Sequence, residues 1–210
     1  MYSGMYVSAG AMLTGMYRMD VHGNNMANME TVGYKSDVPT LRQRASAREE
    51  QGLPFLPSNV MLDKLGGGVL MAANRISLAQ GTISNSSSPL DVAVDGDGYL
   101  VVGDPGDKAS PIKFTRDGRM TLSRKGELVQ STSGRPVLDT SSRPITLDPE
   151  LDVTIDSKGN IHQGGDVVAT IQLSTISDLT QLRKSGDGLF TSTEEQIKKR
   201  VPATGKIRAK

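Results

Sequence analysis

The first 35 residues place methionines and small side chains at alternating steps of four and three. This series is Met5, Ala9, Met12, Met16, Met19, Gly23 and Met26. Heptad spacing of this kind draws one stripe along a helix, and such a stripe packs against a second helix. The sequence therefore predicts an N-terminal helix whose methionine face, defined by these seven residues, is completed by a partner.

Four glycines interrupt the same segment, at Gly4, Gly10, Gly15 and Gly23. Each costs up to about 1 kcal/mol relative to alanine inside a helix, so the isolated helix should be only marginally stable. We therefore expect a helix that forms on assembly, with methionines that adapt to different neighbours. An ordinary core helix is the alternative, which is disfavoured because the rest of the chain reads as β-rich and has no second helix of matching length.

The predicted helix should end near Gly33, which can adopt the left-handed conformation that terminates helices. We assign residues 1–35 to this helical segment. Residues 36–68 are expected to form an extended linker, because three prolines and a glycine triplet disfavour a folded domain there. The arginine-rich stretch 42–50 within it could form a short helix.

The composition narrows the possible functions. The 210 residues can hold one good-sized domain with extensions or two small domains, and the 36% hydrophobic content suffices for a core. A formal net charge of +1 gives no general reason to expect nucleic acid or an anionic membrane as a partner. The absence of cysteine excludes disulfides, thiolate metal sites and cysteine nucleophiles.

The amino terminus lacks the basic and then compact apolar regions of a cleaved secretory signal, because polar residues and glycines interrupt residues 1–19. No apolar run reaches the length of a membrane span. We therefore expect no membrane insertion, and a protein that either stays in the cytoplasm or leaves it without cleavage.

Beyond residue 68 the hydrophobic pattern changes to period two. Leu90, Val92 and Val94 alternate with smaller or polar residues, and a turn at Gly96–Gly98 leads into Tyr99–Val102. Further short strands are expected at 112–115, 119–122, 127–130, 137–138, 152–155, 160–163 and 167–175. Turns that end in glycine, each offering a residue that tolerates positive φ, separate several of them. The sequence thus predicts one antiparallel β domain over residues 69–175.

The remaining residues 176–210 are expected to form a return segment, with a short helical piece at 178–183, and a basic tail. From residue 194 onward six basic residues accompany two acidic ones, which is typical of a solvated tail. No C-terminal helix complements the first one. The predicted fold class is therefore mainly β: one antiparallel β domain with an N-terminal heptad-patterned α-helix and extended linkers.

No catalytic or metal-binding constellation is evident. His22 in the helix and His162 in a predicted strand have no second histidine nearby to build a metal site. The acidic run around Asp95 fails the EF-hand spacing, because Ala93 or Tyr99 falls at a ligand position. The glycine triplet lacks the Lys-Ser/Thr of a phosphate-binding loop, and no G-x-S-x-G nucleophile motif occurs. We expect no enzymatic activity, no cofactor and no metal.

Two motifs resemble those of bacterial flagellar basal-body rod and hook proteins. Residues 23–35 read GNNMANMETVGYK and are similar to the family signature A-N-N-L-A-N-x-x-T-x-G-[FY]-K. Residues 80–83 (QGTI), 89–99 (PLDVAVDGDGY) and 114–118 (FTRDG) are similar to the family's Q-G-x-l, p-L-D-l-A-I-x-G-x-G-F-F and y-T-R-x-G. The motifs occur in the family's order, and with the β region the resemblance covers most of the chain.

The resemblance implies a structural subunit of the flagellar rod, distal or proximal, which polymerises helically and transmits torque from motor to hook. Terminal helices would line the inner tube, with the β domain outside. The implied partners are copies of itself, other axial proteins of rod and hook, and the flagellar type III export apparatus. The implied location is the periplasmic axial structure of the basal body, reached without a cleaved signal peptide.

The resemblance also assigns residues. The expected assembly-interface residues are Met5, Met12, Met16, Met19, Asn24, Asn25, Met26 and Asn28. The expected family-motif residues are Gly33, Tyr34, Leu90, Asp91, Gly96, Gly98, Thr115, Arg116 and Gly118. The three asparagines would cap the helix, bond neighbouring subunits, or do both, and Gly33 with Tyr34 would turn the chain away from the rod core.

The sequence departs from the family at its end. Family members usually continue past a G-k-I-r-x-G-x-L-E-x-S-N-V segment into a second terminal helix, whereas this sequence stops within the matching segment, at 205–210. Either the chain is a truncated product, or its first helix finds its partner on other subunits; in both cases the methionine face is unsatisfied in an isolated monomer. A function of a different class is a secreted β-rich binding or adhesion module that the N-terminal helix oligomerises.

Overall fold

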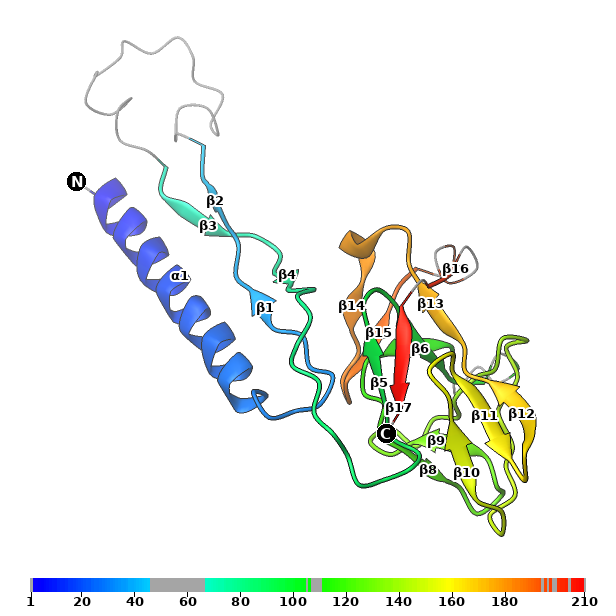
Figure 1. Ribbon diagram of the computed structural model, residues 1–210. Helices are drawn as coiled ribbons and strands as arrows, with labels where there is room; N and C mark the ends of the chain where they lie inside the picture. The colour runs from blue at the N-terminus through cyan, green and yellow to red at the C-terminus, as the bar shows by residue number, and fades with distance from the viewer. Residues whose placement is uncertain are drawn as a thin grey trace. The chain divides into compact units, whose positions relative to one another are not determined.

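The computed structural model describes residues 2–45, 67–104, 106, 111–193, 195, 197, 200–203 and 205–209. The chain divides into two compact units, whose elements are labelled in Figure 1. The helical unit comprises Met1–Glu30 and Lys35–Leu78, and the β domain comprises Thr31–Tyr34 and Ala79–Lys210. The chain therefore touches the β domain briefly after the helix, returns to the helical unit, and enters the β domain again at Ala79.

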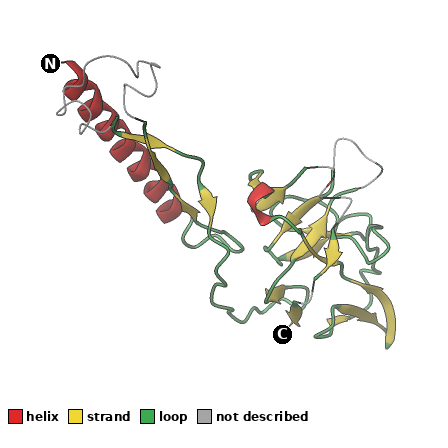
Figure 2. Cartoon of the chain, turned by 90° about the horizontal axis from the view of Figure 1, so that it is seen from above, coloured by secondary structure: helices red, strands yellow, loops and turns green. Residues whose placement is uncertain are grey.

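The helical unit consists of one long helix and a narrow ribbon of strands. The helix α1 spans Tyr2–Ala27. The four strands are β1 (Asp37–Val38), β2 (Leu41–Gln43), β3 (Val69–Met71) and β4 (Arg75–Ile76). β1 pairs with β4 and β2 pairs with β3, both antiparallel, and we call these four strands the ribbon. Figure 2 shows the ribbon beside the single long helix.

This unit differs from the sequence expectation in two respects. α1 ends at Ala27, before Gly33, and the amide of Met29 bonds the carbonyl of Met26 in the tightened turn that follows. Residues 36–68, expected as an extended linker, contain β1 and β2, because their main chain finds hydrogen-bond partners in β3 and β4. Arg42 lies in β2 and not in a short helix; the arginine-rich stretch from residue 46 onward lies outside the described residues.

The β domain is built on a six-stranded antiparallel sheet in the order β14, β15, β7, β6, β13, β16. The bounds of these strands are β6 (Tyr99–Val102), β7 (Lys113–Thr115), β13 (Leu173–Thr175), β14 (Arg183–Lys184), β15 (Leu189–Thr191) and β16 (Val201–Pro202). A short 3-10 helix, η1, spans Leu179–Gln181 within the expected helical piece.

Smaller antiparallel sheets complete the domain. β5 (Val92–Asp95) pairs with β17 (Lys206–Ala209), and β8 (Met120–Leu122) pairs with β9 (Leu128–Gln130). A three-stranded sheet contains β10 (Val153–Ile155), β11 (Asn160–Gln163) and β12 (Asp166–Thr170). The expected strand at 167–175 is thus divided between β12 and β13, and the expected strand at 137–138 forms only isolated bridges.

The period-two pattern explains the core. In β5, Val92 and Val94 are buried while the residues between them are partly exposed. Phe114 and Phe190 are the largest fully buried side chains, and Phe190 meets the Tyr99 ring edge-on at 5.6 Å between centroids. The predicted fold class, mainly β with one N-terminal helix and antiparallel sheets, is confirmed.

The end of the chain is part of the β domain, whereas residues 176–210 were expected to form a return segment and a solvated basic tail. β17 lies antiparallel to β5, where Ile207 is opposite Val94 and only 1% exposed. Arg208 forms a 2.7 Å ion pair with Asp95. The basic residues flank an inward-facing isoleucine, so counting charge alone hid a strand pattern. Three other basic residues of this stretch, Lys198, Lys199 and Lys210, lie outside the described residues.

Candidate functional site

The methionine face of α1 is exposed in the helical unit. Its methionines are 64–74% exposed: Met5 68%, Met12 71%, Met16 64%, Met19 74% and Met26 73%. Leu13 beside them is 61% exposed. These side chains form an exposed apolar stripe along α1, and exposed apolar patches are typical of surfaces that contact other proteins.

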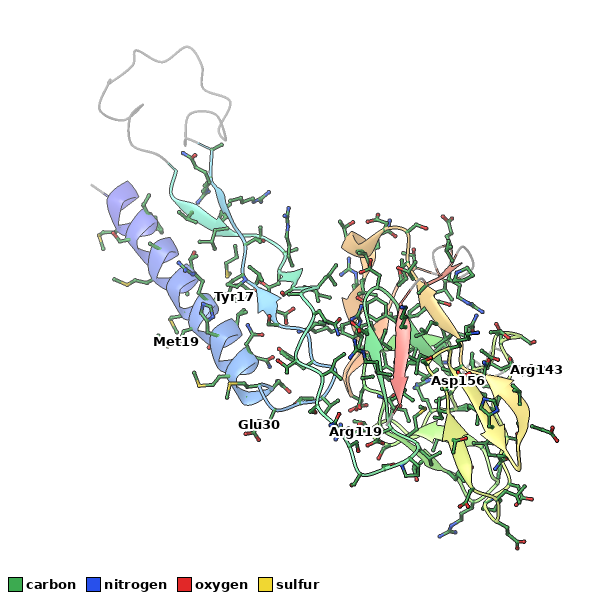
Figure 3. The ribbon with its side chains drawn as sticks, viewed as in Figure 1. Tyr17, Met19, Glu30, Arg119, Arg143 and Asp156 are labelled. Carbon is green, nitrogen blue, oxygen red and sulfur yellow. The ribbon has the colours of Figure 1, made fainter. Side chains whose placement is uncertain are left out.

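The opposite side of α1, the packed face, lies against the ribbon. Its buried or half-buried residues are Val7, Gly10, Thr14, Tyr17, Val21 and Asn25. The hydroxyl of Tyr17 donates a 2.9 Å hydrogen bond to Oδ1 of Asn74. At about 100° per residue the packed and methionine series fall on opposite sides of the helix. Figure 3 shows Tyr17 directed toward the ribbon and Met19 directed away from it.

Sequence reasoning missed the packed face, although a signal was present. Val7, Gly10, Thr14, Tyr17 and Val21 also follow steps of three and four. Because the series includes glycine, threonine and tyrosine, a search for strongly apolar stripes detects the methionines only. Small residues serve here because a strand ribbon lies close to the helix.

The three asparagines expected at an assembly interface lie in the last turns of α1 and just after it. Asn25 bonds the main chain of Asp37 in both directions: its Nδ2 donates to the carbonyl at 2.8 Å, and its Oδ1 accepts from the amide at 2.9 Å. Nδ2 of Asn28 donates to the carbonyl of Asn24 at 2.9 Å. These bonds cap the helix and hold β1 beside it, and a role in subunit contacts stays a prediction.

Three family-motif residues lie in the turn between β7 and β8, which we call the TRDG turn (Thr115–Gly118). The fully buried Thr115 donates its hydroxyl to the carbonyl of Gly188 at 3.0 Å. The same Oγ1 accepts from Nε2 of Gln130 at 3.2 Å and from the amide of Asp117 at 3.1 Å. This threonine therefore ties the turn to two other segments.

Gly118 permits a close approach of two strands. A Cβ at this position would lie 1.8 Å from the carbonyl oxygen of Val92, and the amide of Val92 donates to the carbonyl of Gly118 at 3.0 Å. The sequence analysis expected a turn here with a residue that tolerates positive φ, but Gly118 does not adopt positive φ. The residue is glycine because only hydrogen fits beside β5.

Asp117 is buried in the same turn with its charge compensated. Its carboxylate accepts hydrogen bonds from Nε and Nη2 of Arg119 at 3.0 and 2.8 Å, and from the hydroxyl of Thr132 at 2.7 Å. Burial raises the pKa of Asp117, but the bonds from Arg119 and Thr132 outweigh it and hold the pKa below its ordinary 3.8. The ionised carboxylate thus stiffens the turn at neutral pH; Arg119 is labelled in Figure 3.

Gly33 and Tyr34 belong to the β domain, where Gly33 contacts the TRDG turn and Tyr34 contacts Lys184. Gly33 has φ of 72°, and a Cβ on it would lie 2.5 Å from the amide nitrogen of Asp117 and 2.7 Å from the carbonyl carbon of Arg116. Nζ of Lys184 lies over the Tyr34 ring, 4.2 Å from the ring centroid. The left-handed glycine predicted from the sequence is present, and it serves this contact rather than the end of α1.

Arg116 joins the other motif stretches. Its Nη1 donates to Oε1 of Gln80 at 2.8 Å, and its Nη2 donates to the carbonyl of Gly96 at 2.9 Å. The guanidinium lies over the Tyr99 ring at 5.0 Å from the centroid. Nε2 of Gln80 donates in turn to the carbonyl of Val94 at 3.0 Å. Residues from three motif stretches that are distant in sequence are therefore in contact around Arg116.

The remaining motif residues have structural positions at the start of the domain. Leu90 packs against the core, and Asp91 accepts a hydrogen bond from the hydroxyl of Ser86. Gly96 and Gly98 lie in the turn between β5 and β6, where the carbonyl of Asp97 accepts from the amide of residue 205 at 3.0 Å.

The two histidines lie in different parts of the chain. His22 is exposed on α1, and Nε2 of His162 lies 3.7 Å from a carboxylate oxygen of Asp156. Within the described ranges, no three side chains of ligand type gather as a metal site would require. The described helices also include none with the length and apolar character to cross a membrane.

Similar proteins identify the class of this chain. Residues 5–35 match the family model described as "Flagella basal body rod protein", and residues 93–163 match "Flagellar hook protein FlgE/F/G D1 domain". The flagellar basal-body rod protein FlgF of Caulobacter vibrioides is 32% identical over 194 residues, which are 92% of this chain and 74% of that protein. The chain belongs to the flagellar basal-body rod protein family.

Other relatives agree with this assignment. The rod protein FlgG of Caulobacter vibrioides is 28% identical over 123 residues, 55% of this chain and 45% of that protein. The rod protein FlgF of Rhizobium meliloti is 30% identical over 173 residues, 82% of this chain and 65% of that protein. This rod-family chain is therefore a structural subunit of the flagellar basal body that assembles with other axial proteins, and it is not an enzyme.

The two matched regions meet in the structure. The rod-family match at 5–35 includes the methionine face and Gly33, and the match at 93–163 includes the TRDG turn. Gly33 contacts that turn through main-chain atoms of Arg116 and Asp117. The two regions that match the family models are therefore in contact at Gly33 and the TRDG turn.

Proposed function

We propose that the methionine face of α1 is the surface through which this rod subunit polymerises, against helices of other copies and of other axial proteins. The supporting observation is that five methionines, each 64–74% exposed, lie opposite a packed face that the ribbon already occupies. Polymerisation with helical symmetry would let the subunit transmit torque from motor to hook.

The chemistry of the exposed side suits such an array. In an open helical assembly one surface meets a different surface of its neighbour, and each contact has its own geometry. Methionine side chains adapt to non-identical neighbours. A Cβ at Gly4, Gly15 or Gly23 would meet nothing within 4 Å, so these positions leave room for another backbone to come close.

We also propose that the chain is exported by the flagellar type III apparatus without cleavage and lies in the periplasmic axial part of the basal body. The glycine content of α1 supports this route, because a marginally stable helix is easily kept unfolded before assembly. The alternative of a secreted β-rich adhesion module finds no support among the similar proteins, which are rod and hook proteins.

The experiment replaces a methionine-face residue by aspartate, as Met12→Asp or Met19→Asp, in a strain that lacks its own copy of the gene. Covering one methionine is worth about 1.5–3 kcal/mol, and a buried carboxylate adds a desolvation cost. We expect loss of motility and absence of the variant from purified hook–basal bodies, with the unfolding transition of the β domain unchanged.

Val168→Asp is the matched control, because Val168 is 48% exposed on β12 of the β domain. It makes the same change from an exposed apolar side chain to a carboxylate, away from α1. We expect it to be incorporated and to support motility. Normal incorporation of both methionine-face variants would contradict the proposal.

A further inference from the structure

Two segments attach the helical unit to the β domain. The first joint, Thr31–Tyr34, follows α1, and the second joint, Ala79–Gln80, follows the ribbon. Both joints are parts of the β domain, and both contact Arg116: Gly33 meets its main chain, and Gln80 meets its guanidinium. One residue therefore contacts both points of attachment.

The contact at the first joint leaves no space for a side chain. The Cβ of any residue other than glycine at position 33 would fall 2.5–2.9 Å from three main-chain atoms of Arg116 and Asp117. The stacked pair of Tyr34 and Lys184, 4.2 Å from ring centroid to Nζ, holds the other side of this joint. The first joint is thus seated on the main chain of the TRDG turn.

The contact at the second joint is directional. The two Nη atoms of Arg116 donate to Gln80 and to the carbonyl of Gly96, and the Tyr99 ring lies under the guanidinium. The buried Nε has no acceptor among the described residues, so those two bonds and the ring set the orientation of the planar group. Gln80 is held at both ends, since its Nε2 also bonds the carbonyl of Val94.

The turn that carries Arg116 is itself fixed on both sides. Thr115 bonds Gly188 and Gln130, and Asp117 bonds Arg119 and Thr132. A shift of either joint therefore acts on a stiff turn and not on a flexible loop.

We propose that the TRDG turn clamps both joints, the first through the main chain of Arg116 and Asp117 and the second through the positioning residue Arg116, so that a displacement at the first joint is passed to the second. In a rod subunit this clamp would share a mechanical load between the two joints, a role that rests on the proposed function above. The clamp itself belongs to the isolated chain and can be tested without assembly.

The test uses nitroxide labels on the full chain, which contains no cysteine of its own. One label is placed by Val32→Cys in the first joint, where Val32 is 46% exposed. The other is placed by Gly81→Cys beside the second joint, where a Cβ would meet nothing within 4 Å. Electron paramagnetic resonance gives the rotational correlation time of each label, and circular dichroism reports whether the β domain stays folded.

We expect Gly33→Val to shorten the correlation time at both labels at least threefold, because a side chain at position 33 displaces the turn that carries Arg116. Arg116→Gln and Gln80→Ala should shorten it at position 81 only, because the bond between these two side chains holds the second joint, whereas Gly33 meets only main-chain atoms of the turn. Gly134→Val is the control: Gly134 has φ of 66° like Gly33, but open space around it, so both labels should keep their mobility.

The clamp would be disproved if Gly33→Val mobilised only the label at position 32 and left the label at position 81 unchanged. An unchanged label at position 81 in Gln80→Ala would also overturn it, and this variant changes an exposed side chain. None of these measurements involves other subunits. A negative result with the labels would therefore not contradict the proposed assembly surface, and loss of the assembly proposal would not contradict the clamp.

Discussion

Gly118→Ala should destabilise the β domain through steric overlap alone. The added Cβ would lie 1.8 Å from the carbonyl oxygen of Val92, so β5 must move by about 1.6 Å to restore an ordinary van der Waals contact. That movement breaks the 3.0 Å bond from Val92 to Gly118, worth about 1 kcal/mol, and partly exposes Val92 and Val94. We expect a total loss of about 2–4 kcal/mol, as for other overpacked cores.

The measurement is urea unfolding of the full chain, followed by circular dichroism. Gly134→Ala is the matched control, because its φ of 66° strains alanine by about 1–2 kcal/mol while nothing lies within 4 Å of the new Cβ. Gly118 does not have positive φ, so its variant isolates the contact with β5. A loss in Gly118→Ala no larger than in Gly134→Ala would refute the argument from close approach.

Two further predictions concern the β domain. Folding lowers the pKa of Asp117, so its ionised form contributes stability above pH 3.8 that is lost as the pH falls through the folded pKa. The free energy of unfolding of the native chain should therefore exceed that of Asp117→Asn by less as the pH is lowered. A constant difference from pH 7 to pH 3 would contradict this. Ile207→Ala should lower the free energy of unfolding in urea by about 2–5 kcal/mol, as for a core isoleucine. A change near zero would show that the end of the chain is a solvated tail.

The elements that sequence predicted well are those whose pattern is local. The period-two run through Val92 and Val94 and the glycine turn after it determine β5 and β6, and α1 follows from an apolar period along a single segment. Gly33 was expected to be left-handed, and it is. Each of these depends on neighbours within a few residues, which a sequence displays directly.

The parts that sequence missed depend on partners far along the chain. β1 and β2 exist because β3 and β4 bond them, and nothing in the proline-bearing segment itself shows that pairing. Ile207 was hidden among basic residues, and its role becomes visible only opposite Val94.

The candidate site divides in the same way. The methionine spacing predicted an apolar stripe, and the exposed side chains of α1 form one. The motif residues Gly33 and Arg116 could be singled out by resemblance, but their contact could not, since it joins a main-chain position to a turn distant in sequence. In the sequence, a close approach of this kind is visible only as a glycine.

The central claim is that assembly covers the methionine face. Brief oxidation by hydrogen peroxide, read by mass spectrometry as methionine sulfoxide, should modify Met12, Met16 and Met19 in the free chain, while Met120, only 4% exposed, stays unmodified in the folded domain. In purified hook–basal bodies that contain the chain, the account predicts that these three methionines are protected at least tenfold relative to the free chain. Equal oxidation in the free and assembled states would show that this face remains open to solvent and would contradict the account.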